Sequence, residues 1–457
     1  MSNFDASLIR DKQRAFFNSG KTKEVSFRIH QLKVFKSIIT EHEKELINAV
    51  YKDFKKPEFE AFAMELGVVH SEIDYAIKKV KKWSKRQKVS TTLVNLPAQS
   101  YIYPSPYGVS LIISPWNYPL LLSLTPLIGA IAAGNCAVLK LSELTPHTSE
   151  AIEKLFKGYF DQDYIRVVNG GVEETQQLLE QQFDYIFFTG STRVGKIIME
   201  AAAKHLTPVT LELGGKSPAI VHNDVDIDVA AKRILWGKFS NAGQTCVAPD
   251  YLYLHTDIKD AFLEALKKHA TRMFGKDPSK SEDYARIIND QHFQRLHGFL
   301  NNGTTYMGGE IDVYDHYIAP TILTDVTWDD EVMKEEIFGP ILPVLEYSDL
   351  AEAIAGIKAQ PKPLALYVFT KSNDVEERVI KEVPFGGGMI NDTVAYLGNH
   401  HLPFGGVGTS GVGSYHGKFS FDTFTHYKGV LKKPFMFDIA LRYAPYKGKL
   451  KWIKKLF

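Results

Sequence analysis

One of the two cysteines of the chain, Cys246, stands in a stretch of small and polar residues between 239 and 249, FSNAGQTCVAP. Once ionised to a thiolate, a cysteine can attack an electrophilic carbon. Gly243 allows the backbone to approach a ligand closely, and the small neighbours leave room for one. A lone cysteine in such surroundings is nevertheless more often a buried packing residue. The stretch alone therefore leaves both a nucleophile and a core cysteine open.

A carboxylate that suits acid–base chemistry stands earlier, at Glu212. It ends an apolar strand and is followed by Gly214 and Gly215. Burial raises the pKa of a carboxyl group, which suits a general base near neutral pH. The alternative is a structural glutamate that is paired with a cation.

Asn117 lies between Pro115 and Pro119, which restrict the backbone on both sides of it. A rigidly placed side-chain amide can donate to an oxyanion that develops during a reaction. The alternative is an ordinary asparagine in a turn.

A candidate phosphate-binding turn follows the apolar strand 184–189 and contains Gly190, Ser191 and Gly195. A glycine turn that leads into a helix presents backbone N–H groups to phosphate. The spacing is neither the dinucleotide fingerprint nor a P-loop, so an ordinary strand–helix connection is equally consistent with it. Lys140 and Glu143 end another strand. A carboxylate there can hold a ribose diol, and the alternative is a surface ion pair.

The elements expected to position these residues alternate between strands and helices. After three helices within residues 5–85, buried strands are predicted at 108–113, 137–141, 164–168, 184–189 and 217–221, with helices near 120–133, 146–158, 172–182 and 192–204. This order predicts a parallel sheet with ligands at the carboxyl ends of its strands. A second α/β region follows, with strands near 251–254, 341–346 and 365–370 and helices near 226–241, 257–274 and 329–336.

Composition limits the class of protein. The 457 residues are 44% hydrophobic and 23% charged, with a net charge of +1, which is typical of a globular enzyme and indicates no nucleic-acid partner. Cys136 and Cys246 form neither a disulfide framework nor a metal-ligand set, and no secretion signal is recognised. We therefore expect a cytoplasmic protein without a bound metal. The uncharged span 109–139 is interrupted by three prolines, which argues against a membrane helix.

Two peripheral segments stand out. Residues 91–94 and 100–103 are predicted to form a β-hairpin that projects from the body. From 431 to 457 the chain has eight basic residues and one acid, interleaved with Leu450, Trp452, Ile453, Leu456 and Phe457. This composition suits weak contact with an anionic membrane surface, which would make the protein peripheral. A solvated or dimer-docked tail is the alternative.

Taken together, seven motifs in one order resemble the aldehyde dehydrogenase superfamily: SPWNYP at 114–119, LKLSE at 139–143, FTGST at 188–192, LELGGKSP at 211–218, GQTC at 243–246, EEIFGP at 335–340 and PFGG at 403–406. The stretch GVGSYHGK at 411–418 is similar to class 3 members, which act on medium- and long-chain aliphatic and aromatic aldehydes.

The resemblance implies an α/β fold with a Rossmann-type cofactor domain built on a parallel sheet, a second α/β catalytic domain and a small β oligomerisation arm. The expected NAD(P)-binding domain covers 1–87 and 107–208, and the catalytic domain covers 209–404. The arm covers 88–106 and 424–434, and a basic tail covers 435–457. A homodimer is expected from the arm.

The resemblance also implies roles for single residues. Cys246 would attack the aldehyde, the amide of Asn117 would stabilise the oxyanion, and Glu212 would activate the water that hydrolyses the thioester. NAD or NADP would be the cofactor. Its binding residues would be Trp116, Lys140, Glu143, Gly190, Ser191, Gly195, Glu336 and Phe338.

Two departures from the family pattern leave the nucleotide open: Leu141 replaces the usual proline, and Arg193 can favour a 2′-phosphate or face solvent. Among rival functions, an acylating dehydrogenase would transfer the thioester to coenzyme A and would not need Glu212. A cysteine hydrolase would need a partnering histidine, such as His222 or His255. A non-enzymatic binding protein, or oxidation of another, smaller aldehyde, are the remaining alternatives.

Overall fold

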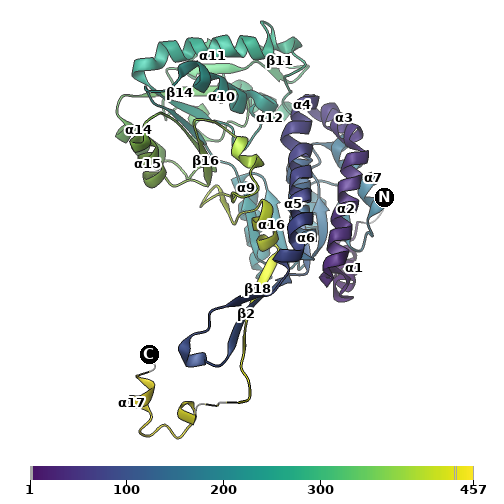
Figure 1. Ribbon diagram of the computed structural model, residues 1–457. Helices are drawn as coiled ribbons and strands as arrows, with labels where there is room; N and C mark the ends of the chain where they lie inside the picture. Colours follow the sequence, from purple (N-terminus) through teal and green to yellow (C-terminus); the bar gives the residue numbers. More distant parts are fainter. Residues whose placement is uncertain (1–3, 437, 439, 456–457) are drawn as a thin grey trace.

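A six-stranded sheet forms the base of the site. The computed structural model describes residues 4–436, 438 and 440–455 (Figure 1). The strand order is β17-β7-β6-β3-β4-β5, parallel except for β17, which pairs antiparallel with β7. The strands are β3 (Val109–Ile113), β4 (Cys136–Lys140), β5 (Ile165–Val168), β6 (Tyr185–Thr189), β7 (Val209–Glu212) and β17 (Gly411–Val412). Their continuous apolar runs are typical of parallel strands buried on both faces.

Helices cover this sheet, and one of them, α6 (Leu121–Ala133), lies within the uncharged span 109–139. Every residue of α6 is buried, and it contacts β3 and β4, so the span is core and not a membrane segment. On its outer side α6 packs against α2 and α5 (Figure 1). The other helices of this part are α1 (Ala6–Asn18), α2 (Val25–Glu41), α3 (Glu43–Phe54), α4 (Glu58–Ala61), α5 (Gly67–Trp83), α7 (Pro146–Tyr159), α8 (Val172–Leu179), α9 (Thr192–Ala203) and α16 (Gly417–Thr423).

A seven-stranded sheet forms the second α/β unit, in the order β10-β13-β14-β9-β8-β15-β16. Its strands are β8 (Pro218–Val221), β9 (Tyr251–His255), β10 (Thr304–Met307), β13 (Thr321–Thr324), β14 (Ile341–Tyr347), β15 (Ala365–Phe369) and β16 (Gly387–Ile390). A two-stranded ladder, β11 (Ile311–Asp312) with β12 (Tyr317–Ile318), lies beside it. The helices are α10 (Ile227–Phe239), α11 (Lys259–Phe274), α12 (Asp290–Phe299), α13 (Glu331–Lys334), α14 (Leu350–Lys358) and α15 (Asn373–Glu382).

The placement of the strand predicted at 217–221 in the first sheet is wrong. It forms β8, which pairs with β9 and β15 in the second sheet. Glycines 214 and 215 follow β7, and the chain crosses there from one sheet to the other. An apolar run predicts a buried strand but not its neighbours. The first sheet itself continues to Glu212, beyond residue 208 where the predicted cofactor domain ends.

The projecting segment is a three-stranded sheet of β1 (Gln87–Val89), β2 (Gln99–Pro106) and β18 (Thr425–Lys432), with β2 in the centre (Figure 1). The predicted strand 91–94 is wrong, because Leu93–Asn95 form a 3₁₀ turn and the pairing strand begins at Gln87. Leu93 is exposed and has no layer to cover it, so apolar character there does not produce a strand.

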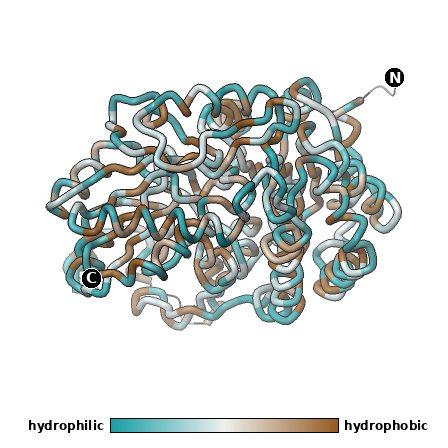
Figure 2. The backbone as a smooth tube through the Cα atoms, turned by 90° about the horizontal axis from the view of Figure 1, so that it is seen from above, coloured by the Kyte–Doolittle hydropathy of each residue, from teal (hydrophilic) through white to brown (hydrophobic). Residues whose placement is uncertain are grey.

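Hydrophobic stretches of the backbone concentrate inside the molecule, while hydrophilic stretches line its periphery (Figure 2). In the described part of the chain, no helix is both long and apolar enough to cross a membrane. In the described part of the tail beyond β18, the helical elements are a 3₁₀ turn at Ala440–Arg442 and α17 (Leu450–Ile453), the latter at the lower end of Figure 1. Leu456 and Phe457 lie outside the described residues.

Candidate active site

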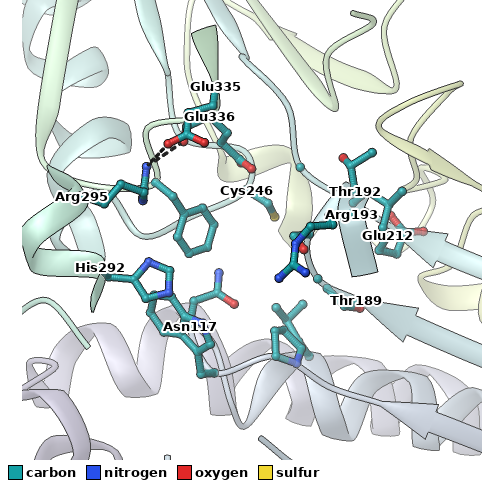
Figure 3. Close-up of a pocket in the computed structure, with 18 residues that line it drawn as sticks. Asn117, Thr189, Thr192, Arg193, Glu212, Cys246, His292, Arg295, Glu335 and Glu336 are labelled. Atoms are coloured by element: carbon teal, nitrogen blue, oxygen red, sulfur yellow. Dashed lines mark hydrogen bonds and ion pairs between the residues drawn. The ribbon is translucent and has the colours of Figure 1, made fainter. Parts of the chain in front are cut away.

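A cleft of about 360 Å³ lies where the carboxyl ends of β6 and β7 face loops of the second sheet. Figure 3 shows Cys246 near its centre, with Asn117, Glu212 and Glu336 around it. The cleft brings together eight of the eleven predicted site residues: Trp116, Asn117, Gly190, Ser191, Glu212, Cys246, Glu336 and Phe338. Lys140, Glu143 and Gly195 lie outside its lining.

The backbone before Cys246 has an unusual conformation that fixes the thiol. Asn241, Ala242 and Gly243 all have positive φ, at 54°, 50° and 73°. A Cβ on Gly243 would collide with the main-chain oxygen of Gly339, so the close approach of these loops requires glycine. Gln244 is buried and binds the main chain of Asn241, Arg286 and Ile288. The left-handed turn and its hydrogen bonds therefore hold residue 246 at the cleft.

Cys246 is also part of a second cavity, of about 310 Å³. This cavity is lined mostly by apolar side chains, among them Phe59, Met64, Val68, Tyr118, Leu121, Trp236, Val394, Leu397, Phe404 and Tyr415. Cys246 and Leu122 line both spaces. The other cysteine, Cys136, is fully buried in β4. Only one of the two thiols thus faces a ligand-sized space.

The Asn117 side chain is held in place by the loop that carries the thiol. Its Nδ2 donates to the main-chain oxygen of Gln244 at 3.0 Å. The amide has two N–H groups, so this bond fixes the side chain and leaves the second N–H for another acceptor. The main-chain oxygen of Asn117 accepts from Nδ2 of Asn241 at 2.9 Å. Two hydrogen bonds thus join the two loops.

Glu212 ends β7 and is buried. Among the described residues, neither of its carboxylate oxygens has a hydrogen-bond partner. Burial raises the pKa of Glu212 well above its usual value. Within the described chain the Glu212 carboxylate is therefore not a hydrogen-bonded, paired glutamate, and its raised pKa suits the predicted general base.

Burial also raises the pKa of the Cys246 thiol, and the neighbouring carboxylates of Glu336 and Glu212 raise it further. These surroundings therefore favour the protonated thiol over the thiolate. A positive charge bound in the cleft would favour the thiolate, since opposite charge lowers the pKa of an acid.

The nucleotide side of the cleft begins at the N-terminus of α9. Ser191 caps this helix, and its Oγ accepts from the backbone N–H of Val194 at 3.3 Å. The guanidinium of Arg193 lies in the same part of the cleft (Figure 3). Backbone N–H groups, the positive end of the helix and an arginine form a suitable site for phosphate.

The opposite wall is formed by the loop 335–339. A Cβ on Gly214 would collide with the Glu336 carboxylate, so this glycine makes room for the acid. Arg295 donates to the main-chain oxygen of Ile337 at 2.7 Å and holds the loop. The ring of Trp116 lies edge-on to Phe338, with centroids 5.4 Å apart. The wall thus combines a carboxylate with aromatic faces, as a ribose and a planar ring require.

Sequence reasoning missed His292 and Arg295, which line the cleft from α12. The ring of His292 lies 5.1 Å from that of Trp116. Burial and the nearby Arg295 lower the pKa of His292 to about 4, so it is neutral at physiological pH. Neither residue belongs to a glycine-rich or paired motif, so no local pattern indicated them.

The three predicted residues outside the cleft have other partners. Nζ of Lys140 donates to the main-chain oxygen of Leu141 at 2.6 Å and lies 3.8 Å from Glu143. A Cβ on Gly195 would meet the side chain of Leu213 at 2.6 Å, which indicates close packing of α9 on the end of β7. Their roles toward a cofactor stay predictions.

Comparison with known proteins agrees with this arrangement. The model of the aldehyde dehydrogenase family matches residues 5–430. The chain belongs to the aldehyde dehydrogenase family. It is 50% identical over 446 residues to the 4,4′-diaponeurosporen-aldehyde dehydrogenase of Staphylococcus aureus (strain NCTC 8325 / PS 47), covering 97% of each chain. It is 47% identical to the dimeric NADP-preferring aldehyde dehydrogenase of Canis lupus familiaris, covering 97% of this chain and 98% of the relative.

Solved structures agree as well. A substrate-bound structure of Staphylococcus aureus AldH matches with a TM-score of 0.97 and 49% identity, covering 98% of this chain and 99% of that one. Aldehyde dehydrogenase family 3 member A2 of Mus musculus is 45% identical to this chain over 444 residues, covering 96% of this chain and 92% of that relative. The chain is thus a class 3-like aldehyde dehydrogenase, an NAD(P)-dependent oxidoreductase. The N-terminus of α9 at Ser191, Glu336 and the aromatic wall of this aldehyde dehydrogenase suit such a dinucleotide.

Proposed function

We propose that this aldehyde dehydrogenase oxidises apolar medium- or long-chain aliphatic or aromatic aldehydes to carboxylic acids, with Cys246 as nucleophile. The observation that supports this most is that Cys246 lines both the polar cleft and the apolar cavity. A dinucleotide in the cleft and an aldehyde in the cavity would meet at its sulfur.

The chemistry divides between three side chains. The Cys246 thiolate attacks the aldehyde carbon, and the free N–H of Asn117 and the backbone N–H of residue 246 donate to the resulting oxyanion. Ser191, Glu336 and Phe338 would hold the dinucleotide in the cleft, where its oxidised nicotinamide would supply a positive charge and a hydride acceptor, so that Cys246 would keep the acyl group as a thioester. Glu212 then takes a proton from water, the hydroxide attacks the thioester, and the acid leaves as the thiolate is restored.

The preference for apolar substrates is inferred from the second cavity. Its lining buries an acyl chain among Met64, Val68 and Leu121 and offers few polar groups. The relative from S. aureus is named as a 4,4′-diaponeurosporen-aldehyde dehydrogenase. An acylating reaction with coenzyme A is disfavoured, because it has no need for Glu212.

The arm and the tail support two further proposals. β18 and β1 are the edges of the arm sheet, and exposed Val430 and Leu431 on β18 suit pairing with a second copy in a homodimer. Tyr446 and Trp452 of the basic tail are exposed beside lysines, which suits weak contact with an anionic membrane surface. A cytoplasmic location suits the proposed nucleophile, because the reducing cytoplasm keeps the thiol of Cys246 reduced.

The test is oxidation of an aldehyde panel with NAD and with NADP, without coenzyme A, followed at 340 nm. Turnover that is fastest with decanal-type or aromatic aldehydes supports the proposal, and the two nucleotides decide the cofactor preference. Turnover only after addition of coenzyme A would reject it.

A further inference from the structure

A buried ion pair lies behind the catalytic loops, away from both cavities. Lys56 and Glu65 both have fully buried side chains, and Nζ of Lys56 lies 2.6 Å from Oε1 of Glu65. Isolated charges are costly to bury, and even a buried pair is often no more stable than apolar residues of the same volume. A contribution to the stability of the fold therefore does not by itself explain why these two charges are buried here.

The first set of contacts connects the pair to Asn117. Nζ of Lys56 lies 3.4 Å from the main-chain oxygen of Asn117, the same oxygen that accepts from Asn241. The other oxygen of Glu65, Oε2, accepts from the backbone N–H groups of Leu120 and Leu121 at 2.9 and 3.1 Å. The pair thus holds the loop 114–119 at its asparagine and at its exit into α6.

A second set of contacts reaches the loop that carries the thiol. The ammonium group of Lys56 lies 3.5 Å from the centre of the Tyr118 ring, a cation–π contact. The hydroxyl of Tyr118 is 2.9 Å from Oγ1 of Thr245, the residue before Cys246. From the same segment, Oε2 of Glu60 accepts from the backbone N–H of Asn241 at 2.8 Å. One stretch of chain, 56–65, thus contacts both loops.

The local helix geometry explains how the segment 56–65 both lines the apolar cavity and carries the buried ion pair. Residues Phe62–Leu66 form a π-helix between α4 and α5. Ala63 and Met64 of this turn line the apolar cavity, whereas Glu65 is turned into the protein toward Lys56. Single π-turns within α-helices are frequent at functional sites, because they change the direction of one side chain relative to its neighbours.

We propose that Lys56 and Glu65 are positioning residues that hold Asn117 at the correct distance from Cys246 for stabilisation of the oxyanion. This inference rests on the proposed function of Asn117 and Cys246. The pair would affect the reaction rate only through the position of Asn117, because neither residue contacts the substrate or the cofactor. A shift of about 1 Å in a reacting geometry can cost about a hundredfold in rate.

The test uses the double variant Lys56→Met/Glu65→Gln in the full-length enzyme. Removal of both charges leaves neither member of the pair without its charged partner, and the amide oxygen of glutamine can still accept from Leu120 and Leu121. We expect the single-turnover rate of nicotinamide reduction to fall about tenfold to a hundredfold. The aldehyde KM and the dinucleotide Kd should change less than the rate, within about twofold, because neither Lys56 nor Glu65 lines the cleft or the cavity.

Addition of Asn117→Ala separates positioning from mere stability. If the pair acts through Asn117, the triple variant should be no slower than Asn117→Ala alone, since coupled residues are not additive. If the triple variant shows the product of the rate losses of the double variant and of Asn117→Ala, the proposal is overturned. An unchanged rate of nicotinamide reduction in the double variant would also overturn it. The control is Gln13→Met, which removes buried hydrogen bonds to Ala137 and Tyr164 far from the cleft. It should lower the Tm without slowing reduction.

Hydrogen exchange gives a measurement that does not depend on the reaction. Peptides that cover 114–122 and 240–248 should exchange faster in the double variant, while the rest of the six-stranded sheet keeps its protection. Equal exchange in these peptides would overturn the proposal. Faster exchange together with a wild-type rate in Asn117→Ala would instead contradict the proposed role of Asn117, so the two failures are distinguishable.

Discussion

The side-chain amide of Asn117 donates to the main-chain oxygen of Gln244, two residues before Cys246, at 3.0 Å. Residues 127 positions apart in the chain are thereby joined at one point. The bond uses one of two amide N–H groups and fixes the direction of the other. A donor that is oriented before the substrate arrives stabilises developing charge without reorganisation, which is the main electrostatic contribution to such reactions.

Replacement of the nucleophile should separate binding from chemistry. We expect Cys246→Ser to lose aldehyde oxidation by about a thousandfold or more, since a hydroxyl is a far weaker nucleophile than a thiolate. The dinucleotide should bind as in the wild type, measured by fluorescence titration. Cys136→Ala is the matched control, because that thiol is buried in β4. Near-normal turnover of Cys246→Ser would reject the assignment.

Glu212 should make stability depend on pH in a defined direction. Its pKa in the folded protein lies above the value of 4.5 expected in the unfolded chain. Above pH 4.5 the folded chain therefore binds more protons at this site, and stability falls as pH rises. Glu212→Gln has no titrating carboxyl group at this position, so it does not lose folding stability in this way as pH rises. Thermal unfolding should show the variant gaining stability over the wild type as pH increases, with little difference at the acidic end of the range. A constant difference would contradict an unpaired buried carboxyl.

Glu336 should make dinucleotide affinity depend on pH. Burial and the nearby Asp250 raise the pKa of Glu336 to about 8, against the opposing charges of Lys216 and Arg295. The ionised carboxylate accepts stronger hydrogen bonds from a ribose than the protonated form does. Affinity measured by calorimetry should therefore increase as pH passes through about 8.

Glu336→Gln should bind the dinucleotide about tenfold more weakly, because hydrogen bonds to charged groups contribute more, and its affinity should be independent of pH over this range. Glu331→Gln, an exposed residue at the start of α13, serves as the control. A pH-dependent affinity that survives in Glu336→Gln would assign the titration to another group.

The apolar cavity should set the preference for chain length. Ala63→Trp places a large side chain in a cavity of about 310 Å³. We expect kcat/KM for a twelve-carbon aldehyde to fall about tenfold to a hundredfold, whereas acetaldehyde, which does not extend past the blocked part, should be oxidised as before. An equal loss for both aldehydes would indicate that the acyl chain lies elsewhere.

The fold and most of the cleft could be predicted from the sequence, because the strands are buried on both faces and appear as separate apolar runs. The neighbours of a strand cannot be predicted in this way, and β8 therefore lies in the second sheet although its apolar run predicts a strand of the first. Only the course of the chain after Glu212 decides between the two sheets.

Some site residues could not be predicted from the sequence for a different reason. His292 and Arg295 reach the cleft from a helix whose local sequence has no chemical motif. The Lys56–Glu65 pair joins residues nine positions apart through a π-helix, a geometry that an ordinary helical periodicity does not predict. Long-range contacts of this kind depend on the packed structure.

The most direct test of the account is mass spectrometry of Glu212→Gln after incubation with a long-chain aldehyde and the dinucleotide. Because hydride transfer does not need this carboxylate but hydrolysis does, the variant should reduce about one equivalent of dinucleotide per site and keep the acyl group as a thioester on Cys246. The absence of an acyl adduct on the peptide that contains Cys246, or an adduct on another residue, would contradict the mechanism.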